Sequence, residues 1–290
     1  MNRLSIQERA KILGCLVEGV SVRATCRLTG AAKKTVLRLI GEFGTACAEY
    51  HDKNVRNVGS KRVQCDEIWS FCYAKQANVP EQYKGQFGFG DVYTWTALDA
   101  DSKLIVSYRI DRRDEEAAYH FIHDLAGRLA DRIQLTTDGH NAYVIAIEDA
   151  FGADVDYAML VKQYTGLLQT KEDSRRYSPA ECCGIRKRKK IGNPIRKDIS
   201  TSYVERMNLN MRMGMRRFTR LTNAFSKKVE NHAHMIAIYF MYYNFGRIHQ
   251  TLRVTPAMEA GVADHVWSLE EIAALAELAK NAVLETCAAK

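Results

Sequence analysis

Apolar residues recur every three or four positions over residues 1–45, which predicts three short helices. Ser5 and Ser21 are suited to cap the first two helices, and Gly30 makes a tight turn before the third. Two short helices joined by such a turn, with a basic face on the next helix, indicate a helix-turn-helix DNA-binding domain. The alternative is a plain three-helix cap with a solvated basic face. The exposed face of the third helix would carry Lys33, Lys34, Thr35 and Arg38.

The pattern changes after a polar stretch at 46–61, which is predicted to be a linker. From residue 62 the chain alternates between strand-like and helix-like segments, an order typical of an α/β domain. We predict an α/β fold with a mixed five-stranded sheet flanked by helices. The predicted strands are 62–73, 92–99, 103–110, 132–138 and 154–160, and the predicted helices are 114–130 and 140–151.

A basic segment at 161–199 interrupts this order and is predicted to be an insertion within a domain that spans 62–260. A block of like charges is typical of a solvated or disordered segment, but beside an active site it could contact phosphates, and both interpretations stay open. Helical spacing resumes at 201–216 and 224–247. The remainder, 261–290, is predicted to be a helical tail that starts at a Ser268–Glu271 capping box.

Charge indicates the class of partner. The 290 residues carry a net charge of +8, with a pI near 9.0, which favours a polyanion such as nucleic acid. No apolar stretch approaches the roughly 20 residues that span a bilayer, and the N-terminus does not resemble a signal peptide. The chain is therefore expected in the cytoplasm, without a membrane partner. Its eight cysteines include no C-x-x-C pair, which argues against a structural zinc site.

Three acids stand out by their positions, although Asp138 alone also fits a strand-ending turn and Glu205 alone an ordinary helical Glu paired with Arg. Asp66 interrupts an apolar strand, Asp138 ends another strand before Gly139, and Glu205 begins a helix. An acid among strand formers loses hydration unless a cation lies beside it, and converging carboxylates suit Mg²⁺. By the period of two along a strand, Glu67 is expected to point away from Asp66. Helical spacing places Asn208, Arg212 and Arg216 on the same face as Glu205, a surface suited to both metal and phosphate.

Three motifs carry a resemblance to a known family. The segments 65–69 (CDEIW), 137–139 (TDG) and 203–212 (YVERMNLNMR) resemble the transposases of the first-named bacterial insertion-sequence family. These are DDE recombinases of the ribonuclease H-like, or retroviral integrase, superfamily. Arg212, seven residues after the last acid, and the segment 243–252 (YNFGRIHQTL) also resemble features of such transposases. The resemblance covers about residues 62–260, although the cysteine-based zinc module of some relatives is not found in this sequence.

This resemblance implies a DNA transposase. Asp66, Asp138 and Glu205 would hold two Mg²⁺ ions, for which Mn²⁺ could substitute. The protein would bind the terminal inverted repeats of a mobile element, hydrolyse the DNA at the element ends to give 3′-hydroxyls, and join them to target DNA. Pairing two ends implies a homodimer or a higher oligomer. The alternatives are a transposase-derived repressor without catalysis and a ribonuclease H-like nuclease that cleaves without joining. Expected DNA contacts are Lys33, Lys34, Thr35, Arg38, Arg186, Lys187, Arg188, Lys189, Lys190, Asn208, Arg212, Arg216, Arg217 and Arg220.

Overall fold

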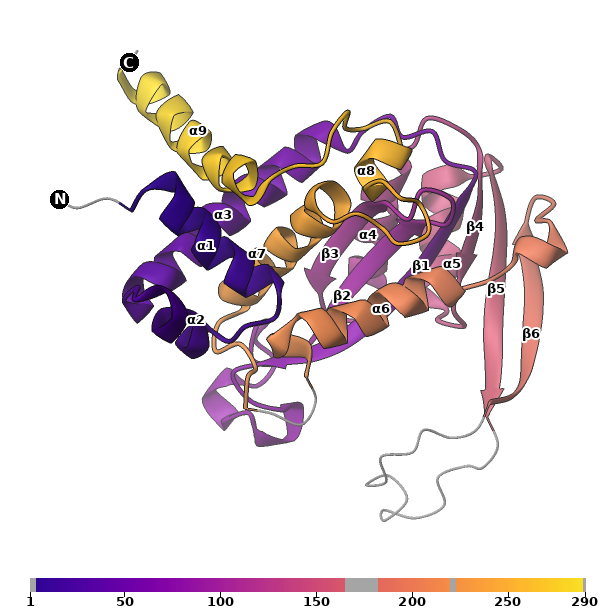
Figure 1. Cartoon of the computed structure of the whole chain (residues 1–290). Coiled ribbons are helices and arrows are strands. Elements are labelled where there is room, and N and C mark those ends of the chain that lie inside the picture. The colour runs from indigo at the N-terminus through magenta and orange to yellow at the C-terminus, as the bar shows by residue number, and fades with distance from the viewer. Residues whose placement is uncertain (1–3, 165–181, 220–222, 289–290) are drawn as a thin grey trace.

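A mixed six-stranded sheet forms the centre of the computed structural model, which describes residues 4–164, 182–219 and 223–288 (Figure 1). The strand order is β3-β2-β1-β4-β5-β6. β1 runs parallel to β4, and β4 runs parallel to β5, whereas the outer pairs are antiparallel. The strands are β1 (Arg62–Cys72), β2 (Gly90–Asp99), β3 (Ile105–Asp111), β4 (Ile133–Thr137), β5 (Val155–Tyr164) and β6 (Cys182–Ile191).

The sixth strand corrects the prediction of five. The segment 182–191, expected within an insertion outside the sheet, pairs antiparallel with β5 from Tyr157–Ile191 to Tyr164–Cys182. β5 itself extends four residues beyond its predicted end. Charged residues are tolerated in β6 because it is the edge strand and nearly all of its side chains are exposed. Its sequence has neither the apolar run nor the alternation by which the other strands were predicted.

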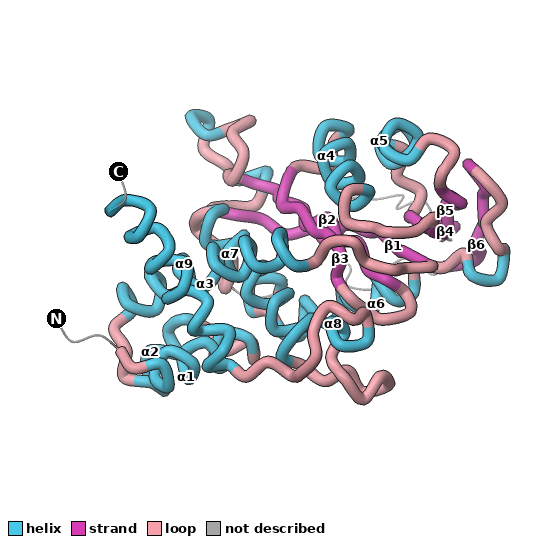
Figure 2. Tube along the Cα trace, turned by 90° about the horizontal axis from the view of Figure 1, so that it is seen from above, coloured by secondary structure: helices cyan, strands magenta, loops and turns pink. Residues whose placement is uncertain are grey.

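Helices cover both faces of the sheet, as predicted. On one face lie α4 (Glu115–Ala126) and α5 (Ala142–Phe151), and α6 (Ser202–Gly214) crosses the other (Figure 2). The start of α4 is fixed by Asp114, whose Oδ1 accepts the backbone N–H of Ala117 at 2.9 Å. Fully buried Trp95 of β2 contacts Phe121 of α4 and Tyr143 of α5. The remaining helices of this half are α7 (Val229–Met241) and the short α8 (Pro256–Glu259).

The N-terminal helices begin where the capping residues predict. They are α1 (Ile6–Val17), α2 (Val22–Thr29) and α3 (Lys33–Asn54). The side chains of Ser5 and Ser21 accept backbone N–H groups at the starts of α1 and α2. Gly30 ends α2 at a φ of 72°, a conformation that favours glycine. Because α3 continues to Asn54, the polar segment predicted as a linker from 46 to 61 is helical over its first nine residues.

One hydrophobic core joins the N-terminal helices to the rest of the chain. α3 packs on α7 so closely that a methyl group on Gly44 would overlap the Cα and Cβ atoms of His234. α9 (Leu269–Ala288) begins at the predicted capping box and packs on α1 and α3. Buried Arg9 pairs there with Glu277 of α9 and lies 3.5 Å from Glu42 of α3. Among the helices described, none is both long and apolar enough to cross a membrane.

Candidate active site

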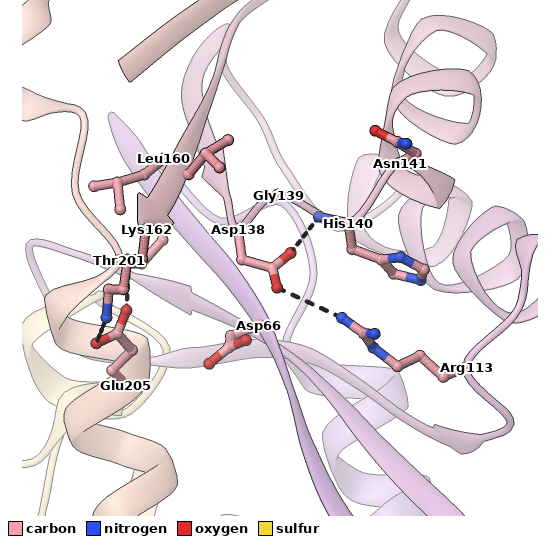
Figure 3. Close-up of a pocket in the computed structure, with 11 residues that line it drawn as sticks. Asp66, Arg113, Asp138, Gly139, His140, Asn141, Leu160, Lys162, Thr201 and Glu205 are labelled. Atoms are coloured by element: carbon pink, nitrogen blue, oxygen red, sulfur yellow. Dashed lines mark hydrogen bonds and ion pairs between the residues drawn. The ribbon is translucent and has the colours of Figure 1, made fainter. Parts of the chain in front are cut away.

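A cleft of about 580 Å³ opens at the end of β4, between the start of α6 and the loop before α5 (Figure 3). All three acids predicted from the sequence line it, each from a different element. Polar and charged side chains dominate the lining, so the cleft suits a charged ligand. The lining residues are Asp66, Arg113, Asp138, Gly139, His140, Asn141, Leu160, Val161, Lys162, Thr201 and Glu205.

Asp66 lies in the middle of β1, on the face that α6 covers. Its Oδ1 accepts the backbone N–H of Glu67 at 2.9 Å, and its Oδ2 accepts the Asn208 side-chain amide at 2.8 Å. Burial, together with the negative charges of Glu67 and Asp138, raises the pKa of Asp66 to about 7. A carboxylate held in this way gains from a bound cation, which would offset both effects.

Asp138 follows the last residue of β4, at the carboxyl end of a parallel strand, where open α/β sheets place their sites. Its Oδ1 accepts the backbone N–H of His140 at 2.9 Å, which orients the carboxylate. Its Oδ2 lies 3.6 Å from the Arg113 guanidinium. A methyl group on Gly139 would contact Val161 of β5 at 3.4 Å, so the turn passes close to the wall of the cleft.

Glu67 is the site residue that the sequence reasoning missed. It lies on the opposite face of β1 from Asp66, as predicted, yet Asp66, Glu67 and Asp138 each offer a carboxylate oxygen within 4.8 Å of the others. The side chain of Glu67 is only 1% exposed, and its Oε2 accepts a hydrogen bond from Arg113 Nε at 3.1 Å. Burial and the charge of Asp138 together raise the pKa of Glu67 to about 7.

The reason that Glu67 reaches Asp138 is the different length of the two strands. The pairing of β1 with β4 ends at Cys65–Thr137, so β1 continues past the end of β4. Both residues that follow Cys65 therefore lie beside the chain as it leaves β4. Asp66 approaches Asp138 from the α6 face, and Glu67 approaches it from the α4–α5 face.

Glu205 lies on the other wall of the cleft, in the first turn of α6. Its carboxylate accepts the Thr201 hydroxyl at 2.5 Å and pairs with Lys162 Nζ of β5 at 2.5 Å (Figure 3). The close group of three carboxylates thus contains Glu67 and not Glu205. Glu205 faces the same cavity, but the ammonium group of Lys162 lies against it.

Two residues of β1 dock α6 onto the sheet. The side-chain oxygen of Gln64 accepts the backbone N–H groups of Tyr203 and Val204, which are the unpaired donors of the first helical turn. Asp66, two residues later on the same face, binds Asn208 one turn after Glu205. Asn208 is only 7% exposed, and its side-chain amide orients Asp66; the phosphate contact expected of Asn208 stays a prediction.

The cations predicted to contact DNA lie in three places. Lys33, Lys34 and Arg38 are exposed on α3, and Thr35 is half-buried beside them. The five basic residues 186–190 are exposed on β6, one strand beyond the cleft wall. Arg216 is exposed after α6 and Arg212 is half-buried, whereas the largely buried Arg217 donates to Ser226 Oγ at 2.6 Å. Arg220 lies outside the described residues.

The donor set fits a hard divalent cation. Mg²⁺ prefers oxygen ligands, and three carboxylate oxygens lie close enough to share one ion. The carbonyl oxygen of the Asn208 side chain is buried beside them without a hydrogen-bond partner among the described residues. Glu205 offers a further carboxylate from the opposite wall. The site can therefore concentrate positive charge around a phosphate group.

Comparisons with known proteins give no family for this chain, only remote similarity to solved structures. No protein-family model matches the sequence, and no curated protein matches it. Among solved structures, the chain is similar to the crystal structure of the Mos1 strand transfer complex, with a TM-score of 0.24 and 12% sequence identity. The match covers 54% of this chain and 59% of that chain. The six-stranded mixed sheet flanked by helices is itself consistent with a ribonuclease H-like fold.

Proposed function

We propose that the chain is a DNA transposase of the DDE kind, which cleaves and joins phosphodiesters in the cleft. The observation that carries the proposal is the convergence of Asp66, Asp138 and Glu205 from a strand, a strand end and a helix on one cavity. Carboxylates on separate elements are what a two-metal phosphoryl-transfer site requires. The net charge of +8 makes nucleic acid the natural substrate.

Each acid has a separate task in this proposal. Two Mg²⁺ ions, or Mn²⁺ in their place, would stabilise the attacking and leaving oxygens of the reaction when bound. Asp66 and Asp138 would hold one side of this centre, with Asn208 and the His140 backbone N–H fixing their orientation. Glu205 would complete the other side after exchanging Lys162 for a metal ion. Water would attack at the element end and leave a 3′-hydroxyl, and that hydroxyl would then attack target DNA.

The basic strand β6 is proposed to contact the DNA phosphates beside the cleft. Leu160, Val161 and Lys162 of β5 line the cavity, and their β6 partners are Lys187, Arg186 and Ile185. Neighbouring strands lie about 5 Å apart, so Lys187 and Arg186 would flank a scissile phosphate bound in the cleft. This placement favours the interpretation of the basic segment as a phosphate-contacting arm over that of a solvated segment.

The exposed basic face at the start of α3 is proposed to bind the terminal inverted repeats, as the second helix of a helix-turn-helix does. Lys33, Lys34 and Arg38 would contact phosphates or base edges. Joining both ends of an element requires two sites, so we propose that a homodimer or a larger assembly is the active form.

The Asp66→Asn variant tests the proposal. It should bind DNA containing the element ends as the native chain does. Its Mg²⁺-dependent cleavage and joining should fall by about a thousand-fold or more, as is usual when an essential catalytic group is removed. Asp131→Asn, at an exposed acid before β4, is the matched control and should keep full activity. Cleavage that persists in Asp66→Asn would show that the site is misassigned.

The products distinguish the two alternatives. Native protein that binds the ends but cleaves nothing with Mg²⁺ or Mn²⁺ would be a transposase-derived repressor. Native protein that cleaves but never joins ends to a target plasmid would be a ribonuclease H-like nuclease.

A further inference from the structure

A row of aromatic side chains continues from the acid cluster along β1 and β2. Trp69 and Phe71 follow Glu67 at alternate positions of β1, so they lie on its face of the sheet. Tyr93 of β2 pairs with Trp69 and shares this face. The Trp69 and Phe71 ring centroids are 5.8 Å apart, and Phe71 lies 4.7 Å from Phe225, which precedes α7.

Three of these rings are not part of the hydrophobic core, whereas Tyr93 packs against its edge. Trp69, Phe71 and Phe225 are half-buried and lie outside the residues that form the main core or pack against it. In contrast, Trp95 on the same face is fully buried beneath α4 and α5. The row therefore begins where the helices no longer cover the sheet.

A cation lies at each end of the row. At the acid cluster, the Arg113 guanidinium is 5.9 Å from the Tyr93 ring centre while it binds Glu67 and lies near Asp138. At the far end, the Lys227 ammonium is 4.4 Å from the ring centre of Phe225, and no carboxylate among the described residues pairs with it. Half-buried rings flanked by cations suit a ligand that has both flat apolar faces and negative charges.

We infer that this row, Tyr93–Trp69–Phe71–Phe225, binds the unpaired bases of a single-stranded DNA segment that leads away from the acid cluster. The inference rests on the proposed function, because it places that strand beside the cleaved phosphodiester. Ring spacings of 5.8 and 4.7 Å exceed the 3.4 Å rise of stacked bases, so a strand that contacts successive rings must be unstacked. A paired duplex, whose bases stay stacked, does not fit this spacing.

Charge distinguishes this occupant from an apolar peptide. A peptide would use the rings but not the Lys227 ammonium, whereas a nucleotide strand places phosphates within reach of the cation while its bases stack. Lys227, which no described carboxylate pairs with, thus favours a polyanion with aromatic bases.

Binding of a labelled oligothymidylate, compared with a duplex of the same length, tests the inference in the full-length protein. The measurement is made in EDTA, so it does not depend on cleavage. Trp69→Leu and Phe71→Leu should each weaken oligothymidylate binding by roughly 5- to 150-fold, the usual range for loss of one stacking ring. Their duplex binding should not change, and Trp69→Phe should bind like the native chain. Lys227→Ala should lower the salt dependence on the single strand by about 0.7 in slope.

Tyr119→Leu is the matched control, because Tyr119 is a 45% exposed ring on α4 away from the row. Its binding to both DNAs should equal that of the native chain. Equal losses on single strand and duplex, or no loss in either leucine variant, would overturn the inference. Phe225→Leu, in the segment before α7, gives an independent test if a strand substitution unfolds the protein. If native protein fails to cleave with Mg²⁺ while these variants still lose single-strand binding, the proposed function fails and the single-strand site stands.

Discussion

Glu67→Gln is expected to stabilise the metal-free protein above pH 7 and to leave its stability nearly unchanged near pH 4, below the pKa of an unfolded Glu. Glu67 is almost completely buried, and it lies with Asp66 and Asp138 in a group of carboxylate oxygens no more than 4.8 Å apart. Gln has the shape of a protonated Glu but never carries the negative charge. The substitution therefore removes repulsion only at a pH where native Glu67 is ionised.

The magnitude follows from two independent routes. Burial and the charge of Asp138 raise the pKa of Glu67 from 4.5 to about 7, which corresponds to about 3 kcal/mol at 1.36 kcal/mol per pH unit. By Coulomb's law with an effective dielectric of 20, each carboxylate 4.8 Å away repels Glu67 by about 3.5 kcal/mol. The guanidinium of Arg113 at 3.1 Å returns about 5 kcal/mol, which leaves a net repulsion of about 2 kcal/mol before desolvation. We expect a gain of 2–3 kcal/mol.

The sign of the pH dependence follows from proton counting. Between pH 4.5 and 7 the native state binds more protons at Glu67 than the unfolded state does, so the free energy of unfolding falls as pH rises. Glu67→Gln lacks this contribution, and the curves for variant and native protein should separate through that window. Urea unfolding at pH 4 and pH 8, in EDTA, measures the separation. Glu148→Gln, at an exposed acid of α5, should follow the native curve at both pH values.

Magnesium should reverse the order of stability of the native protein and the Glu67→Gln variant. Metal binding requires ionised ligands and stabilises the folded state. If Glu67 belongs to the cation site, saturating Mg²⁺ at pH 8 should stabilise native protein more than the variant. Glu67→Gln that is less stable than native protein at pH 8 in EDTA would refute the argument from repulsion. An equal response to Mg²⁺ would remove Glu67 from the metal site.

The remaining predictions concern the other wall of the cleft and the N-terminal packing. Lys162→Met removes the cation that pairs with Glu205, so in the absence of DNA Mg²⁺ should bind up to about five-fold tighter by calorimetry, and weaker binding would show that the two cations do not compete. Gly44→Ala should lower the free energy of unfolding by about 1–3 kcal/mol, because the added methyl overlaps the His234 backbone. Gly41→Ala, one turn earlier on α3 with only ring atoms of His234 at 3.9 Å, should instead gain up to about 1 kcal/mol. Equal effects of the two alanines would show that α3 and α7 can move apart.

Local signals in the sequence were sufficient to predict most elements of the fold. Ser5, Ser21 and Ser268 mark helix starts that the structure confirms, because a cap is a bond between neighbours in the chain. The polar composition of 46–61 concealed a helical continuation of α3. That continuation is held by contacts of Tyr50 with Phe245 and Trp267, which lie far away in the sequence.

β6 could not be predicted for a related reason. Its basic residues have no strand-like alternation. Its backbone forms hydrogen bonds with β5 along one edge, while the side chains on both faces stay in contact with solvent. An exposed edge strand buries little apolar surface, so the hydrophobic pattern that predicts other strands is absent from it. The same exposure leaves its cations available to a polyanion.

The presence of Glu67 in the site shows what side-chain periodicity alone does not predict, which is where a neighbouring strand ends. Alternation along β1 correctly places Asp66 and Glu67 on opposite faces, and in a continuous sheet that would separate their carboxylates. The sheet is not continuous there, because β4 ends at Thr137 and only the loop carrying Asp138 lies beside both residues. Side chains on opposite faces of a strand are kept apart only where the neighbouring strand continues beside them. At a strand end, two consecutive acids can therefore meet a third, and a consecutive Asp-Glu pair that outlasts its parallel neighbour is a signal that sequence analysis could use.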